Sequence, residues 1–128
     1  MKLLLDTHLL LWTAGQQKCL SNAARALLAN SDNELLFSAA SLLEIAIKRQ
    51  FGRHDFSVEP RLLRRGLLDN GYSELAITSE HAMAFDILPP IHKDPFDRIL
   101  VAQALAEGVA LLTTDPLVAQ YPGSIRKV

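Results

Sequence analysis

Two acidic residues of this sequence each follow an apolar run that is typical of a buried strand. Asp6 comes directly after Leu3–Leu5, and Asp115 comes directly after the run 111–114. In an open parallel sheet, ligands bind in the crevice outside the carboxyl ends of the strands. Each residue also has a purely structural interpretation, because a polar residue must end a buried strand somewhere and Asp115 could cap a turn that begins at Pro116.

A third acidic residue, Glu44, lies in the almost wholly apolar stretch 39–47 of a predicted helix. It fits a capping box with Ser41, in which the two side chains satisfy the first amides of a helix. However, the apolar neighbours predict that Glu44 is partly buried, where an uncompensated charge is costly. A metal ion would compensate that charge.

A fourth, Asp97, lies in the first turn of a predicted helix that Asp94 caps and Pro95 opens. A negative charge there favours the helix dipole, and this explains Asp94 without any function. Asp97 shares its helix face with apolar residues three, four and seven positions further on. This spacing predicts that Asp97 points inward, and we favour a functional role for it.

Acidic side chains that meet in one crevice repel each other, which raises their pKa values unless a cation binds between them. Oxygen ligands select a hard cation, and Mg²⁺ is the usual ion where phosphate is the substrate, with Mn²⁺ as a plausible substitute. Such an ion can activate water, orient a phosphodiester and stabilise the leaving oxygen. The four residues together therefore indicate metal-assisted cleavage of a phosphodiester.

The elements that must position these residues alternate between strand and helix. The predicted strands are Leu3–Leu5, Leu35–Ser38, Glu74–Ile77, Val109–Thr113 and a short last one at Ile125–Val128. The predicted helices are Ser21–Asn30, Ala40–Phe51, Pro60–Asn70, Ser79–Asp86 with Ser79 as N-cap, Asp94–Glu107, and a turn at Pro116–Gln120. This alternation predicts an α/β domain whose mainly parallel sheet of four to five strands is covered on both faces.

Composition narrows the class of protein. A chain of 128 residues with 49% hydrophobic residues can form one domain around one sizeable core. The single cysteine, Cys19, excludes an internal disulfide and a thiolate zinc site, and favours a reducing cytosol. No apolar run is long enough to span a bilayer, and Asp6 and His8 interrupt the one that resembles a signal peptide. We expect a cytoplasmic protein.

The formal net charge of −1 does not by itself indicate nucleic-acid binding, but the basic residues are clustered. One cluster contains Lys48, Arg49, Arg53 and His54, and the other contains Arg61, Arg64 and Arg65. Each cluster is either a solvated helix face or a local source of phosphate contacts. The loop 92–94 has prolines on both sides and is expected near the proposed site. It is a further candidate for contact with substrate.

Four segments carry a family resemblance. Leu4–His8 resembles the opening strand motif of PIN domains, and Ser38–Lys48 resembles the helix that bears their second acidic residue. His92–Ala104 is similar to the third acidic motif, especially in VapC-like toxins, and Thr113–Asp115 resembles the fourth. Each motif is weak alone, whereas the set of four in this order, over nearly the whole chain, is specific.

The resemblance implies a single PIN domain over residues 1–128, with a three-layer α/β/α fold. It implies an Mg²⁺- or Mn²⁺-dependent ribonuclease, the toxin of a VapBC-type toxin–antitoxin pair. It further implies a homodimer that a small VapB-like antitoxin holds inactive. The implied site residues are the core ligands Asp6, Glu44 and Asp97, the more variable fourth acid Asp115, and Asp94 as an accessory that is equally explained as an N-cap. Thr7 and Thr114 are either hydrogen-bonding partners of the ligands or ordinary strand-end hydroxyls. Phosphate binding beside an acidic site needs basic groups, so we also expect RNA contacts among the basic candidates Lys48, Arg49, Arg53, Arg61 and Arg65.

Other functions stay open at this point. A DNA-directed nuclease would use the same cation, whereas a phosphatase of the haloacid-dehalogenase type would need an Asp-x-Asp-x-Thr pattern that Asp6-Thr7-His8 lacks. A non-catalytic module is the alternative from another class, either a PIN-like scaffold or a phospho-receiver. A receiver would need paired acids after its first strand and a late lysine, and neither is present here.

Overall fold

Five parallel strands form one sheet at the centre of the computed structural model, which describes residues 1–128. The strand order is β3-β2-β1-β4-β5, and every neighbouring pair is parallel. The strands are β1 (Lys2–Leu5), β2 (Glu34–Ser38), β3 (Ser73–Leu75), β4 (Ala110–Thr113) and β5 (Ile125–Lys127). The predicted α/β class is confirmed, and the sheet is wholly rather than mainly parallel.

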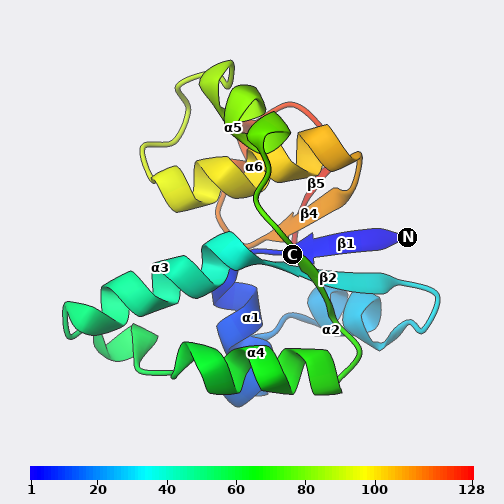
Figure 1. Cartoon of the computed structure of the whole chain (residues 1–128). Coiled ribbons are helices and arrows are strands. Elements are labelled where there is room, and N and C mark those ends of the chain that lie inside the picture. Colours follow the sequence, from blue (N-terminus) through cyan, green and yellow to red (C-terminus); the bar gives the residue numbers. More distant parts are fainter.

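Helices cover both faces of this sheet (Figure 1). Helices α5 and α6 lie on one face, α1, α2 and α4 lie on the other, and α3 runs outward from the end of β2. The helices are α1 (Thr7–Gly15), α2 (Asn22–Ala29), α3 (Ala39–Gln50), α4 (Pro60–Asp69), α5 (Ser79–Asp86) and α6 (Pro95–Glu107), with short 3-10 turns η1 (Gln17–Cys19), η2 (His54–Phe56) and η3 (Val118–Gln120). No helix combines the length and the hydropathy that a bilayer-spanning segment requires.

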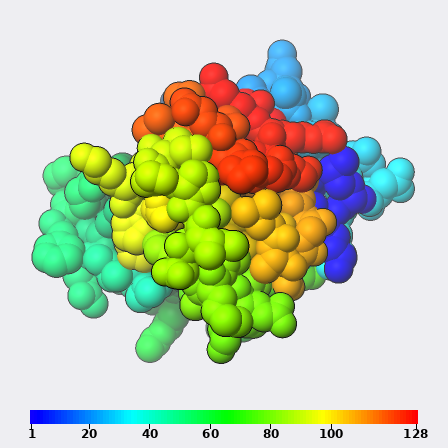
Figure 2. Space-filling model, turned by 90° about the horizontal axis from the view of Figure 1, so that it is seen from above, coloured from blue at the N-terminus to red at the C-terminus, as the bar shows by residue number.

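Two apolar cores result from the alternation of side chains along the strands. Leu3 and Leu5 of β1 pack against the face that carries α1, α2 and α4, while Leu4 packs against α6 on the other face. All three leucines are fully buried. This continuous apolar run is what a strand inside a doubly covered parallel sheet requires. Figure 2 shows the second face from outside, with α5 and its loop (yellow-green) over α6 (yellow to orange).

The strand register brings the carboxyl ends of β1, β2 and β4 to the same edge of the sheet. Leu4 pairs with Leu36 of β2, and Leu5 pairs with Leu112 of β4. The amide of Asp6 continues this pairing by donating to the carbonyl of Leu112 at 3.0 Å. The residues after these three strands therefore meet, as the sequence analysis assumed.

Several predicted boundaries differ from the structure. Helix α1 was not predicted; it begins directly after Asp6 and is capped by the Asp6 side chain. The capping box of Ser41 with Glu44 is wrong, because the N-cap of α3 is Ser38, three residues earlier. Ser38 accepts a hydrogen bond from the amide of Ala40, so Ser41 and Glu44 lie inside the helix and are free to contact other elements.

The region of β3 and α5 also differs. Strand β3 ends two residues before the predicted end at Ile77. The N-cap of α5 is Thr78 rather than Ser79, and it forms a reciprocal pair with the side chain of His81. A capping residue must have an extended backbone while its side chain reaches the third amide, and Thr78 fulfils both conditions. The remaining boundaries agree with the prediction within two residues.

Candidate active site

Asp6 lies at the junction of β1 and α1 and is 5% exposed. One carboxylate oxygen accepts from the amide of Leu9 at 2.9 Å, and the other accepts from the hydroxyl of Thr113 at 2.7 Å and the amide of Thr114 at 3.4 Å. Burial raises the pKa of Asp6 above its ordinary value of 3.8, and these hydrogen bonds oppose the rise. The carboxylate is therefore held in one orientation.

Glu44 of α3 is 3% exposed, which confirms the prediction that it is buried. The hydroxyl of Thr7 donates to its Oε1 at 2.6 Å and lies 2.9 Å from the hydroxyl of Ser41. Its Oε2 accepts from the ammonium group of Lys48, one turn later in the same helix. Lys48 also lies 4.0 Å from Asp94, so a lysine of this chain partly compensates two carboxylates.

Asp94 and Asp97 lie at the start of α6. Asp94 is the N-cap, as predicted, and accepts from the amide of Phe96 at 2.8 Å. The pKa of Asp97 is raised from 3.8 to about 7, first by burial and then by repulsion from Asp94, Glu44 and, more weakly, Asp6, while His92 opposes the rise. Thr7, which follows Asp6, binds Glu44, and Lys48 lies near both Glu44 and Asp94, so these acidic residues of three elements lie in one region.

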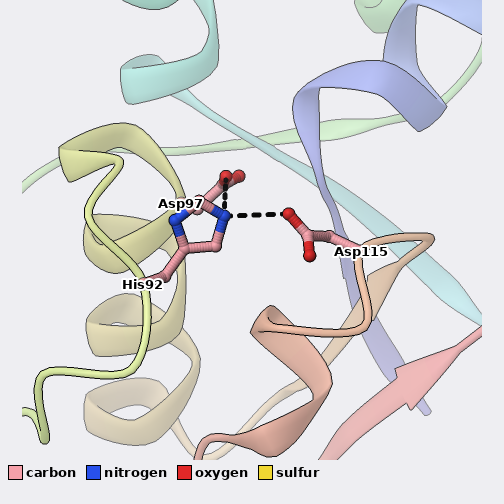
Figure 3. Close-up of side chains that lie close together, drawn as sticks. All are labelled: His92, Asp97 and Asp115. Carbon is pink, nitrogen blue, oxygen red and sulfur yellow. Dashed lines mark hydrogen bonds and ion pairs between the residues drawn. The ribbon is translucent and has the colours of Figure 1, made fainter.

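Asp115 follows β4 and meets Asp97 through the imidazole of His92 (Figure 3). The Nε2 of His92 lies 2.9 Å from the Oδ2 of Asp115 and 3.3 Å from the Oδ2 of Asp97. Burial favours a raised pKa for Asp115, but hydrogen bonds from His92 and from the amide of Leu117 outweigh it, and the pKa is lowered. Asp115 therefore both caps the following turn and faces the site.

Two contributors to this site were not identified from the sequence. The first is Thr113, whose hydroxyl binds Asp6 and accepts from the amide of Asp115 at 3.0 Å. The second is the link that His92 makes between Asp97 and Asp115. The sequence predicts that its loop lies near the site, but it does not predict this contact. Thr114, in contrast, contributes a backbone amide and no side-chain hydrogen bond.

The basic candidates are separated by the structure. Only Lys48 contacts the carboxylates of the site. Arg53 pairs with Asp55 and lies over the ring of Phe56, on which Lys48 also lies. The other arginines proposed for RNA are exposed and form no ion pair with the site carboxylates; they are Arg49 on α3 and Arg61 and Arg65 on α4.

The chemistry of these donors fits a hard divalent cation. Apart from one imidazole, the site offers carboxylate oxygens, which are the ligands that Mg²⁺ and Mn²⁺ prefer. Burial and, after it, repulsion from neighbouring acids raise the pKa of Asp97, and a cation between these acids would offset both. Ligand atoms of His92, Asp97 and Asp115 lie within 4.8 Å of one another, close enough to share an ion.

Comparisons with known proteins agree with this fold. A chain of VapBC2 from Rickettsia felis, solved bound to a promoter DNA fragment, has a TM-score of 0.72 at 14% identity. A chain of VapBC-1 from nontypeable Haemophilus influenzae has a TM-score of 0.63 at 18% identity. Both alignments cover 99% of this chain and 98% of the other, whereas no curated protein matches the sequence. The family model of the PIN domain matches residues 3–123, and the chain therefore belongs to the PIN domain family.

Proposed function

We propose that this protein is a divalent-cation-dependent endoribonuclease and the toxin of a VapBC-type toxin–antitoxin pair. The observation that carries the proposal is the convergence of acidic side chains from four segments at the carboxyl edge of the sheet. Direct contacts support it: Thr7, which follows Asp6, binds Glu44, Lys48 lies near both Glu44 and Asp94, and His92 lies against both Asp97 and Asp115. The family match and the two VapBC neighbours agree with it.

The proposed ligands are Asp6, Glu44, Asp97 and Asp115, with Asp94 as an accessory. A bound Mg²⁺ or Mn²⁺ would supply Lewis acidity at the scissile phosphate and at the attacking water. The chain itself fixes the carboxylates before any ion arrives, Asp6 through Thr113 and Glu44 through Thr7. In-line attack by water would leave a 5′-phosphate and a 3′-hydroxyl.

The RNA backbone would be held by basic residues beside the acidic edge. Lys48, Arg49 and Arg53 lie on the second half of α3 and just after it, and Arg61 and Arg65 lie on α4, which contacts α3. Each phosphate contact releases condensed counterions, so binding should weaken with salt. Replacing Arg49 or Arg61 by glutamine should reduce the slope of log K against log salt by about 1 if that residue binds a phosphate. An unchanged slope would mean that the residue does not contact an RNA phosphate.

The activity is tested with structured RNA in Mg²⁺ and in EDTA. Wild-type protein should cleave only with the cation, and Asp6→Asn and Asp97→Asn should each lose cleavage. Asp86→Asn, which replaces an exposed carboxylate at the end of α5, is the matched control and should cleave normally. Cleavage that survives in EDTA or in both site variants would contradict the mechanism. Faster cleavage of a DNA of the same sequence would reassign the substrate.

A protein partner would bury an apolar surface of this chain, and the structure has one. A groove of about 680 Å³ lies between α1, α2 and α4, lined mainly by apolar side chains such as Leu20, Leu28 and Leu63. Leu62, which lines this groove, is 61% exposed and is therefore accessible to an apolar partner. We assign the groove to an apolar segment of the VapB-like partner encoded by the neighbouring open reading frame.

Co-purification tests that assignment. Leu62→Glu should prevent co-purification with the neighbouring gene product and leave the melting temperature within a few degrees of wild type. Met83→Glu, which changes an equally exposed apolar residue on α5, is the control and should retain the partner. Loss of the partner in both variants would contradict the assignment of the groove to the partner. The proposed homodimer is measured separately, by sedimentation velocity of the chain alone.

A further inference from the structure

The imidazole of His92 is fixed by contacts at both of its nitrogens. Nε2 lies between the Oδ2 atoms of Asp115 and Asp97, at 2.9 and 3.3 Å (Figure 3). Nδ1 faces the backbone amide of Asp94, 3.0 Å away. The His92 side chain is 16% exposed, so solvent has little access to either contact.

The contact at Nδ1 decides where the ring proton lies. A backbone amide can only donate, so Nδ1 accepts this hydrogen bond and carries no proton. The proton of the neutral ring is then on Nε2, between the two carboxylates. His92 therefore presents an N–H group, and not a lone pair, to Asp97 and Asp115.

The backbone of the loop holds the ring in this place. The amide of His92 donates to the hydroxyl of Tyr121 at 2.8 Å, and its carbonyl accepts from Arg98 at 3.3 Å. Tyr121 is 4% exposed and belongs to the core on the α6 face of the sheet. The position of His92 is thus set by packing that does not depend on the acidic side chains.

The three ligand atoms of His92, Asp97 and Asp115 are close enough to hold an ion, but the tautomer opposes that use. Ligation by Nε2 would require its proton to move to Nδ1. The proton on Nδ1 would then face the amide proton of Asp94 across 3.0 Å, with two donors and no acceptor. An ion that bridged the two aspartates would also occupy the position of the Nε2–H group.

We propose that His92 is a positioning residue that joins Asp115 to Asp97 through its Nε2–H group and keeps a cation out of the space between these two aspartates, so that the site binds one divalent cation and not two. The cation in this statement rests on the proposed function, whereas the tautomer of His92 does not. The inference removes Asp115 from the ligands named under the proposed function, because its carboxylate is then held by a histidine instead of by metal.

The tautomer is tested without metal. Nitrogen-15 NMR of histidine-labelled protein in EDTA should assign the proton of His92 to Nε2, and His92→Gln should keep the geometry because its amide offers one acceptor and one donor. A proton on Nδ1 overturns the inference whether or not the protein binds a cation.

The number of cations is tested by Mn²⁺ titration followed by electron paramagnetic resonance. Wild type and His92→Gln should bind one Mn²⁺ per chain with no histidine nitrogen coupling, and His92→Ala should bind a second at the freed aspartates. His54→Ala removes an exposed histidine and should match wild type. Two Mn²⁺ in wild type, or a nitrogen coupling that His92→Ala removes, overturns the inference. Binding of no Mn²⁺ overturns the single-cation half and contradicts the proposed function, while the NMR result still decides the role of His92.

Discussion

Replacing Asp97 by asparagine should stabilise the protein in the absence of metal. The pKa of Asp97 is raised from 3.8 to about 7, a shift that corresponds to about 4 kcal/mol of unfavourable energy for the ionised form. The side chain is 21% exposed, and solvent screening should reduce this to about 2 kcal/mol. Loss of a favourable charge at the start of α6 costs about 0.3–1 kcal/mol in the other direction. We therefore expect a net stabilisation of about 1–2 kcal/mol.

The sign of the effect depends on pH. Below about pH 4 Asp97 is protonated in both the folded and the unfolded chain, so the variant should gain nothing. Between about pH 4 and 7 the unfolded chain loses this proton while the folded chain retains it, and wild type loses stability relative to the variant as pH rises. Above about pH 7 both forms are ionised and the difference reaches its plateau. The loss of the favourable charge at the start of α6 also arises only where Asp97 of wild type is ionised.

Urea denaturation in EDTA, at a series of pH values between about 4 and 8, measures this difference. Asp86→Asn is the control, and its free energy of unfolding should stay within about 0.5 kcal/mol of wild type throughout. Excess Mg²⁺ should reverse the order by stabilising wild type and not Asp97→Asn. A difference between wild type and Asp97→Asn that does not grow with pH would refute the reasoning that neighbouring carboxylates and burial act on Asp97.

Three further predictions concern single contacts. Thr113→Val removes the hydroxyl donor to Asp6 and should cost about 1–3 kcal/mol in urea denaturation at neutral pH, and less in acid, where Asp6 needs no donor. Lys48→Met removes the ammonium partner of Glu44 and should destabilise the metal-free protein by about 2 kcal/mol. Because the lysine and the cation compete for the same carboxylate, the variant should bind Mn²⁺ more tightly in calorimetry. Weaker binding would contradict this competition. Gly108→Ala should lower stability by about 1 kcal/mol because Gly108 ends α6 at φ 66°, whereas Gly66→Ala inside α4, where an added Cβ meets nothing within 4 Å, should raise it by about 0.5–1 kcal/mol.

The sequence allowed the sheet to be predicted because its strands are short apolar runs that end in turn residues or charges. It did not allow α1 to be predicted, because Leu9, Leu10 and Leu11 are all buried and such a helix shows no amphipathic period. Its N-cap, Asp6, is interpreted in the sequence as a metal ligand, and this interpretation hides its role as the start signal of the helix. The wrong capping box at Ser41 has a similar cause, since both Ser38 and Ser41 are good N-caps and only the end of β2 decides between them.

The positions of the acidic residues were predictable from strand ends and helix starts, but their partners were not. The bond between Thr113 and Asp6 joins residues 107 positions apart and exists only because β1 pairs with β4. The bond between His92 and Asp115 spans 23 positions and depends on how the loop before α6 packs on Tyr121. No local pattern carries this information, because it arises from the register of the sheet and from packing.

The position of Asp6 as the cap of α1 has an evolutionary consequence. Asparagine caps a helix as well as aspartate does, so Asp6→Asn should remove the charge and keep the start of α1 intact. One nucleotide change converts an aspartate codon into an asparagine codon. A copy of this gene that carries the Asp6→Asn substitution would then still encode a folded chain with an unaltered groove between α1, α2 and α4. Under the proposed function, such a copy would compete with the active toxin for its antitoxin, so inactivation at this residue would produce a decoy rather than a loss of the protein.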